Sequence, residues 1–323
     1  MGNIYAALIS WLSAKKDGGS WLLRIEDLDK QRCKREWADR LMDDLLWLGL
    51  DWDEGPGKKS LQDQNRAANE GPAKIAGGAA QGLQDQNCAA AKSYYQSERD
   101  SIYKKYFSAL EELGLVYDCF CRRADLLAAS APHASDGTPI YAGTCRDLSA
   151  ADRERLLKER SPAKRIRLPD RESIFVDGHY GPQKCKLARD AGDFIIRRAD
   201  GNFSYQLAVT VDDALMGVTQ VARGRDLLAS THQQLFLYKS LGLAAPQFLH
   251  FPLLVDKEGR RLSKRDKDLD MGYLRTRFSP QEIIGKLMFL CGMSPACKPM
   301  DLQEAAAIFA WNKLSQEDIV VGE

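Results

Sequence analysis

Three stretches of the chain repeat apolar residues at the three- and four-residue spacing of an amphipathic helix. Each is followed by glycine, the residue that most readily adopts the left-handed conformation beyond a helix end. A fourth helix is expected between a polar start at 230–231 and Gly242, and a fifth in a short apolar stretch near the carboxyl end. The sequence therefore predicts helices over residues 4–12, 37–48, 102–113, 230–241 and 283–290.

Shorter apolar runs alternate with these helices and predict β-strands. They cover residues 21–25, 205–211, 218–222 and 248–255, and the first runs directly into the acidic segment 26–29. Strands that alternate with helices are typical of a mostly parallel sheet with helices on both faces. We therefore expect an α/β fold.

One segment, residues 57–93, breaks this regularity. It is rich in Ala, Gly, Gln and Asn, and the string LQDQN occurs in it twice, at 61–65 and 83–87. Two copies are too few for a stacked repeat array, which needs about three. With almost no aromatic or β-branched residues the segment cannot repay its ordering entropy, so we expect a disordered insertion. An artefact of the gene model is the alternative.

Composition and charge restrict the compartment and the partners. The 323 residues carry 46 Lys and Arg against 45 Asp and Glu, so RNA could be held only by local basic segments such as 164–167 and 260–267. No apolar run approaches the ~20 residues of a membrane span, and no export signal is evident. We expect a cytoplasmic protein without a membrane segment, whose eight cysteines are thiols or metal ligands.

Three cysteines have the spacing of a metal site. Cys119 and Cys121 lie two residues apart on an expected extended segment and so point to the same side, and Cys145 follows a loop. Tetrahedral zinc needs a fourth ligand, and the local candidates are His133, Asp136 and Tyr141, with His133 the default on general chemistry. The alternative is that these cysteines are small buried side chains.

Two further signals concern phosphate and carboxylate binding. Lys264 lies in a basic loop, residues 260–265, where a lysine could reach a polyphosphate, although a solvated loop is the commoner explanation. Arg223 and Arg225 follow an expected strand, and either could bind a carboxylate through paired hydrogen bonds, although surface ion pairs are commoner. Residues 212–213, two aspartates, are only suggestive, because acidic residues often end a strand.

Five strings in the right order carry a family resemblance. Residues 23–29 (LRIEDLD), 95–99 (YQSER), 205–213 (YQLAVTVDD), 221–228 (VARGRDLL) and 261–265 (RLSKR) resemble the RIED, YQS, YQLAVVVDD, VVRGADLL and KMSKS-like motifs of the class I glutamyl-tRNA synthetase family. The match is closest to its short branch, the glutamyl-queuosine tRNA(Asp) synthetases. The resemblance covers most of the chain outside residues 57–93.

The resemblance implies a class I Rossmann-like fold with a doubly wound parallel sheet. Its first half would occupy residues 1–118, a small zinc-binding insertion 119–165, its second half with the KMSKS-like loop 166–270, and a short helical tail 271–323. The resemblance also implies that Glu26, Tyr205 and Arg223 bind glutamate. Lys264 would bind ATP and stabilise the departing pyrophosphate, with Mg²⁺ alongside the phosphates. The implied zinc ligands are Cys119, Cys121, Tyr141 and Cys145.

Two departures from the family pattern affect the expected function. Residues 1–3 resemble only the end of the family's HIGH-like tetrad, so its first strand and the turn that contacts glutamate and ATP are missing from the sequence. We therefore expect an N-terminally truncated chain that is catalytically crippled as written. Only 59 residues follow Lys264, too few for an anticodon-binding domain of about 100 residues.

This length favours the short branch, whose members activate L-glutamate with ATP and transfer it to the queuosine base in the anticodon stem-loop of tRNA(Asp). The alternatives are a glutamyl-tRNA synthetase fragment that charges tRNA(Glu), and a non-catalytic RNA-binding relative. A monomer is expected.

Overall fold

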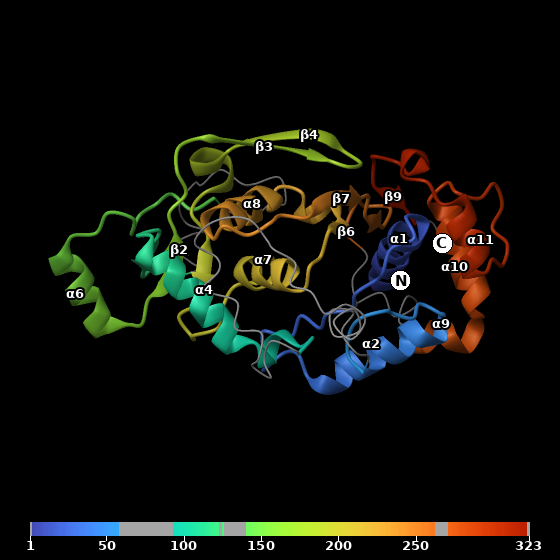
Figure 1. Cartoon of the computed structure of the whole chain (residues 1–323), viewed down its shortest axis with the longest axis horizontal. Helices are drawn as coiled ribbons and strands as arrows, with labels where there is room; N and C mark the ends of the chain where they lie inside the picture. The colour runs from blue at the N-terminus through green and yellow to red at the C-terminus, as the bar shows by residue number, and fades with distance from the viewer. Residues whose placement is uncertain (1, 58–92, 123–124, 126–139, 262–270, 322–323) are drawn as a thin grey trace, which may run out of the picture.

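The computed structural model describes residues 2–57, 93–122, 125, 140–261 and 271–321 as an elongated α/β molecule (Figure 1). Its helices are α1 (Gly2–Lys16), α2 (Arg35–Trp47), α4 (Asp100–Glu112), α6 (Ala150–Glu159), α7 (Tyr205–Leu215), α8 (Thr231–Ser240), α9 (Met271–Arg277), α10 (Pro280–Leu290) and α11 (Leu302–Ile308). Its strands are β1 (Val116–Cys119), β2 (Ala163–Ile166), β3 (Glu172–Asp177), β4 (Gly181–Lys186), β5 (Ile195–Arg197), β6 (Gln220–Gly224), β7 (Gln247–Phe251), β8 (Leu254–Val255) and β9 (Ile319–Val320).

The five helices predicted from periodicity and end signals are confirmed as α1, α2, α4, α8 and α10. Gly49 and Gly114 take positive φ values of 81° and 67° just beyond α2 and α4, as a glycine helix end requires. A capping box between Ser279 and Glu282 begins α10, which satisfies backbone N–H groups that would otherwise have no partner. Across these ranges, no helix combines the length and the apolar character needed to cross a lipid bilayer.

The predicted strand over residues 205–211 is wrong, because this segment forms helix α7. Ser204 begins the helix, and its hydroxyl accepts the N–H of Leu207. The residues from Leu207 to Asp213 are all buried, so the helix has no exposed polar face here and the run shows no helical period. Tertiary packing has here overridden the strand preference of Val and Thr.

The parallel sheet is narrower than expected. Strands β6 and β7 pair in parallel with Arg223 opposite His250, and helix α8 connects them. Strands β8 and β9 form a second parallel pair. The predicted strand over residues 21–25 makes only single bridges, Leu22 with Glu54 and Ile25 with Tyr95, so among the described residues it joins no sheet.

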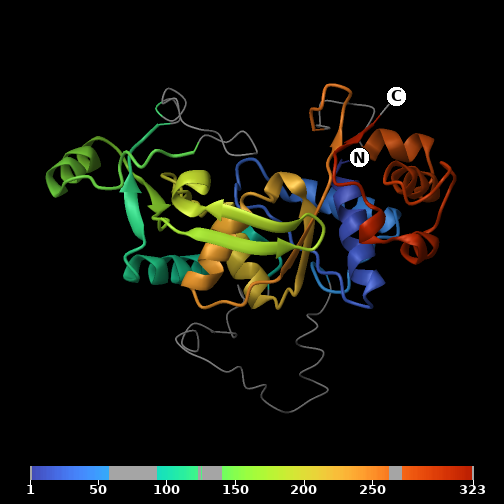
Figure 2. The same cartoon turned by 90° about the horizontal axis from the view of Figure 1, so that it is seen from above.

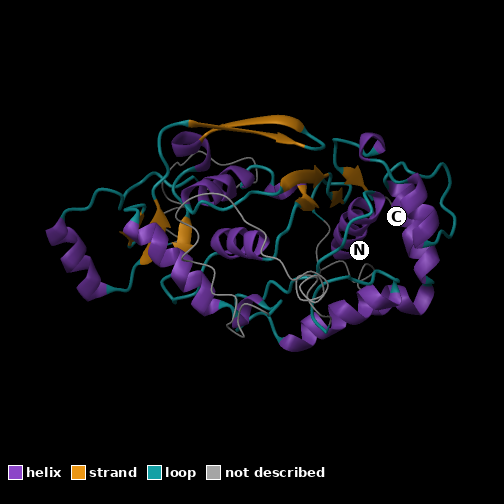
Figure 3. Ribbon diagram, in the orientation of Figure 1, coloured by secondary structure: helices purple, strands orange, loops and turns teal. Residues whose placement is uncertain are grey.

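Two antiparallel units were not predicted. One is the sheet β1-β2-β5, and the other is the hairpin β3/β4, which lies across the molecule on the side of α8 and β7 (Figures 2 and 3). Their strands have three to six residues, which is too short for an alternating pattern to stand out from chance.

The buried side chains form two main cores. One joins α1 and α2 to the carboxyl-terminal helices, where Ile4, Leu8 and Leu12 pack with Leu287 and Phe309. The other lies between α4, α7 and α8 and includes aromatic residues of α4 and leucines of α7 and α8. The helical tail is therefore packed against the first helix of the chain. The predicted domain boundaries stay predictions, and residues 58–92 lie outside the described part.

Candidate active site

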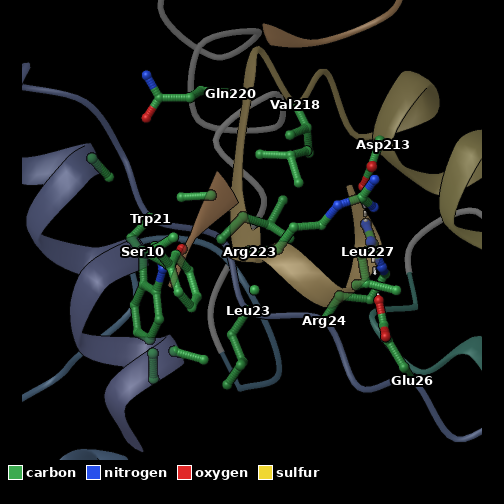
Figure 4. Close-up of a pocket in the computed structure, with 18 of the residues that line it drawn as sticks. Ser10, Trp21, Leu23, Arg24, Glu26, Asp213, Val218, Gln220, Arg223 and Leu227 are labelled. Atoms are coloured by element: carbon green, nitrogen blue, oxygen red, sulfur yellow. Dashed lines mark hydrogen bonds and ion pairs between the residues drawn. The ribbon is translucent and has the colours of Figure 1, made fainter. Parts of the chain in front are cut away.

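A pocket of about 1060 Å³ lies between α1, the segment 21–26 and strand β6. Glu26, Tyr205 and Arg223, which come from three distant parts of the sequence, all line it. Figure 4 shows Arg24, Glu26, Asp213 and Arg223 toward one side of the pocket, with Ser10 and Trp21 toward the other. The structure thus gathers the three predicted glutamate-binding residues around one cavity.

Two of the three nitrogens of the Arg223 guanidinium group contact neighbouring side chains, and the third has no partner among the described residues. Its Nε donates to Nε2 of His250 at 3.1 Å, and its Nη2 donates to Oγ1 of Thr231 at 2.9 Å. The guanidinium carbon lies 5.0 Å from the ring centroid of Phe248, a cation–π distance. The Nη1 atom is buried and, in the part of the chain that is described, has no hydrogen-bond partner. Such an atom is suited to a substrate carboxylate.

Glu26 supplies negative charge at the same end of the pocket. Its side chain is 40% exposed, and its Oε1 lies 3.4 Å from Nη2 of Arg24. Arg24 is also tied to Asp213 by a 2.8 Å ion pair between side chains that are 9% and 5% exposed. Because Arg24 is shared between two carboxylates, its single charge can balance only one of them, and the other could pair with a substrate ammonium group.

Tyr205 lies at the first turn of α7 and faces the pocket. Burial, reinforced by the nearby carboxylate of Glu26, raises the pKa of its phenol well above its ordinary value. The hydroxyl therefore stays protonated and can donate a hydrogen bond to a substrate oxygen.

The predicted metal-ligating residues lie together, and Leu156 of α6 packs against them. Helix α6 lies at the opposite end of the molecule from α1 (Figure 1). The sulfur atoms of Cys119, Cys121 and Cys145 lie within 4.8 Å of one another. The hydroxyl oxygen of Tyr141 lies 3.6 Å from the sulfur of Cys119 and 3.8 Å from that of Cys121. His133, the default fourth ligand on general chemistry, lies outside the described residues.

A buried arginine favours negative charge on Cys119, whereas burial raises the pKa of Cys121 to about 12. The Nε of Arg165 lies 3.2 Å from the sulfur of Cys119, and its guanidinium carbon lies 3.8 Å from the ring centroid of Tyr141. Burial alone would raise the pKa of Cys119, but contacts with Tyr141 and Arg165 outweigh it and lower that pKa. A lowered thiol pKa favours the thiolate, the form that binds metal.

Comparison with known proteins identifies the fold family. The family described as "tRNA synthetases class I (E and Q), catalytic domain" matches residues 1–321. The chain belongs to this family. It is therefore related to ligases of the class I aminoacyl-tRNA synthetase type, and the predicted resemblance is confirmed.

Curated relatives fall into two groups. The chain is 42% identical to the glutamyl-Q tRNA(Asp) synthetase of Nitratidesulfovibrio vulgaris and 40% identical to that of Symbiobacterium thermophilum, and in each case the match covers 99% of this chain and 91% of the relative. It is 37% identical to glutamate–tRNA ligase 2 of Alkalilimnicola ehrlichii, with 98% of this chain and 64% of that protein covered.

A solved structure supports the fold. The crystal structure of a glutamate tRNA ligase from Elizabethkingia meningosepticum in complex with its amino acid matches with a TM-score of 0.72 at 26% identity, over 99% of this chain and 64% of that chain. The α/β class I synthetase catalytic fold is thereby confirmed for this chain.

The two candidate arginines for carboxylate binding, Arg223 and Arg225, have different surroundings. Arg225 makes two contacts with the carboxylate of Asp318, at 2.5 and 2.6 Å, is 43% exposed, and does not line the pocket. Of the two candidates, only Arg223 therefore faces the cavity. Lys264 lies outside the described residues, and Arg261, in the first part of the same loop, contacts Asp226 at 2.5 Å.

Helix α7 carries a buried carboxylate that sequence reasoning left undecided. Asp212 is fully buried and accepts hydrogen bonds from Nε of Arg99 at 2.7 Å, the hydroxyl of Tyr103 at 2.7 Å and Nε2 of Gln96 at 3.0 Å. Two of these donors, Gln96 and Arg99, belong to the motif YQSER. The signal available in the sequence was the presence of this motif together with the distant double aspartate at 212–213. Asp212 thus links α7, whose neighbouring residue Asp213 lines the pocket, to α4 and to the turn before it.

Proposed function

We propose that the chain activates L-glutamate with ATP, giving glutamyl-adenylate and pyrophosphate, and transfers the glutamyl group to the queuosine base of tRNA(Asp). The observation that carries the proposal is the convergence of Glu26, Tyr205 and Arg223 on one pocket, where Nη1 of Arg223 has no partner among the described residues. An acidic group, a phenol and an arginine match the ammonium and carboxylate groups of an amino acid.

The residues would divide the work of positioning. Glu26 would pair with the substrate ammonium group, and Arg223, helped by Tyr205, would bind the side-chain carboxylate. The α-carboxylate would then stay unpaired and able to attack the α-phosphate of ATP, because a carboxylate held by arginine is a weaker nucleophile. Rate enhancement would come from orientation and charge stabilisation.

Lys264 would neutralise charge on the leaving pyrophosphate, and Mg²⁺ would supply further neutralisation of the phosphates when bound. We infer that ATP and Mg²⁺ bind in the part of the pocket toward α1, where Gly2, Asn3 and Ser10 line the wall.

The choice of tRNA rests on the pattern of similarity. Identity is higher, and coverage of the relative greater, for the glutamyl-Q tRNA(Asp) synthetases than for the glutamate–tRNA ligase of Alkalilimnicola. We infer that the acceptor is the anticodon stem-loop of tRNA(Asp), bound through local basic segments, and that the chain acts as a cytoplasmic monomer.

Transfer of labelled glutamate tests this choice. A version carrying the family's first strand and turn ahead of residue 1 is incubated with ATP and with tRNA(Asp) that has or lacks queuosine, or with tRNA(Glu). We expect label only on queuosine-containing tRNA(Asp). Label on tRNA(Glu) alone would instead assign the chain to the glutamate–tRNA ligases, and tRNA binding without label would indicate a non-catalytic relative.

We also propose that Cys119, Cys121, Tyr141 and Cys145 hold a structural zinc ion. Tetrahedral zinc at about 2.3 Å from sulfur and about 2.1 Å from oxygen places ligand atoms roughly 3.6–3.8 Å apart. The sulfurs of Cys121 and Cys145 lie 3.6 Å apart, and the oxygen of Tyr141 lies 3.6 and 3.8 Å from two sulfurs, so the residues fit. When bound, a zinc ion in such a closed site contributes folding free energy and takes no part in catalysis.

Metal analysis of the purified protein checks the zinc site. We expect about one zinc per chain, and a loss of most of it in Cys145→Ser, because serine is a poorer zinc ligand than a thiolate. Cys33 is exposed and lies outside the cluster, so Cys33→Ser is the matched control and should keep its zinc. Protein that retains no zinc after purification without chelators would contradict the site.

A further inference from the structure

A continuous line of hydrogen bonds runs from the hairpin β3/β4 to the pocket. Oδ2 of Asp177 lies 2.6 Å from Nδ1 of His250, and Nε2 of His250 lies 3.1 Å from Nε of Arg223. Asp177 and His250 are 1% and 0% exposed. Neither residue lines the pocket, so the line ends at Arg223.

The chemistry of the three groups fixes which atoms carry hydrogen. An arginine can only donate, so Nε2 of His250 must be the acceptor and the imidazole must be neutral. A neutral imidazole then carries its hydrogen on Nδ1 and donates it to the carboxylate of Asp177. Burial lowers the pKa of His250, which keeps the ring neutral at neutral pH.

Asp177 accepts from His250 through Oδ2, because its other oxygen, Oδ1, already accepts backbone N–H groups. Oδ1 accepts the backbone N–H groups of His179 at 3.0 Å, Tyr180 at 2.9 Å and His250 at 3.3 Å. Burial alone would raise the pKa of Asp177, but the hydrogen bonds from His250, Tyr180 and His179 outweigh it and lower that pKa. The group is therefore an ionised acceptor whose orientation is set by the backbone of the β3/β4 turn.

Strand register and one backbone contact of the hairpin bring Arg223, His250 and Asp177 together. Arg223 and His250 are register partners on the parallel strands β6 and β7, so their side chains lie next to each other on one face of the sheet. Asp177 is the last residue of β3, and the N–H of the following residue, Gly178, bonds to the carbonyl of Phe248 at 2.9 Å. The hairpin is thus attached to β7 two residues before His250, the residue that its carboxylate contacts.

We propose that Asp177 and His250 are positioning residues for substrate binding: together they fix the imidazole tautomer that accepts from Nε of Arg223 and so hold the guanidinium group of this pocket-lining arginine in one orientation. This inference rests on the proposed function, because it requires that Arg223 binds glutamate. Thr231 completes the support by accepting from Nη2. Without these hydrogen bonds the guanidinium group could rotate about its side-chain bonds. Ordering it on binding would then make the binding free energy of glutamate less favourable.

Asp177→Asn is the informative variant. Its carbonyl oxygen can keep the three backbone contacts, so its NH₂ group faces Nδ1 of His250. Nδ1 must then accept, the ring hydrogen moves to Nε2, and two donors face each other at Arg223. We expect glutamate to bind at least about tenfold more weakly, with the affinity for ATP unchanged.

Ser173→Ala is the matched control. It removes a 2.9 Å contact between the same hairpin and the buried His232, but it does not touch the line to Arg223. It should leave glutamate affinity as it is in the unchanged chain. If both variants weaken glutamate equally, or if Asp177→Asn weakens ATP as much as glutamate, the effect is one of hairpin docking and the positioning role is overturned.

A second measurement observes the tautomer of His250 directly in the unchanged chain, and a variant serves only to assign the signal. The chain has only four histidines, so ¹⁵N spectra of the imidazole nitrogens can be resolved, and His250→Gln identifies the signal. We expect hydrogen on Nδ1 and a bare Nε2. Hydrogen on Nε2 would overturn the inference. A chain with the expected tautomer that binds no glutamate would instead count against the proposed function, so the two failures are distinguishable.

Discussion

Replacing Arg223 with alanine is expected to weaken glutamate binding about 100-fold, close to 2.7 kcal/mol. The variant loses a charge-assisted hydrogen bond in a buried setting, where such bonds are strongest. It also leaves Nε2 of His250 and Oγ1 of Thr231 without the donor that they share in the unchanged chain. Calorimetric titration with L-glutamate measures the change, and circular dichroism establishes that the variant is folded.

Arg225→Ala is the matched control for this experiment. The two residues are separated by one position, but Arg225 is half exposed, pairs with Asp318 and lies outside the pocket lining. Its loss should cost little, as for other exposed ion pairs, and should leave glutamate affinity unchanged. An equal loss of glutamate affinity in both variants, or an unaltered affinity in a folded Arg223→Ala, would show that Arg223 does not bind glutamate.

Replacing Asp212 with alanine is expected to lower the free energy of unfolding by about 3–5 kcal/mol. The substitution removes the carboxylate that Nε of Arg99 contacts at 2.7 Å, and both side chains are almost completely buried. Tyr103 and Gln96 lose the same acceptor, and buried donors without partners add to the cost. Urea denaturation followed by circular dichroism gives the free energy.

Asp43, a surface carboxylate, is the control for the effect of Asp212 on the free energy of unfolding. Asp43 is 68% exposed and contacts Arg275, which also contacts Asp44. Asp43→Ala should cost less than about 1 kcal/mol. If Asp212→Ala cost no more than Asp43→Ala, the network around Asp212 would not be a determinant of stability, and the link between α7 and α4 would need another explanation.

Helix α7 shows how a motif can place residues correctly while its secondary structure is predicted wrongly. Tyr205 and Asp213 both line the pocket. Eight residues apart, they would be separated by about 26 Å along a strand, but by only about 12 Å along a helix. The helix therefore brings both ends of one motif to one cavity. Periodicity could not reveal it, because the residues from Leu207 to Asp213 are buried on every side.

The support behind Arg223 could not be predicted, because it depends on strand register and on a hairpin contact over 73 residues of sequence. Neither His250 nor Asp177 has a local pattern that distinguishes it from an ordinary buried polar residue. The helices with an exposed face were predictable from spacing and terminal glycines. The three cysteines come together as their local spacing indicated, and Tyr141 lies beside them as the family resemblance implied. General chemistry alone favoured His133 as the fourth ligand.

The central claim is that the pocket between α1 and β6 recognises an activated glutamate. The most direct test is calorimetric titration of the chain with the non-hydrolysable sulfamoyl analogue of glutamyl-adenylate, compared with the glutaminyl analogue, which differs only in carrying an amide. We predict saturable binding that favours the glutamyl analogue by at least about tenfold, because Nη1 of Arg223 pairs more strongly with a carboxylate than with an amide. Equal affinity for the two analogues, or no binding of either, would contradict the account.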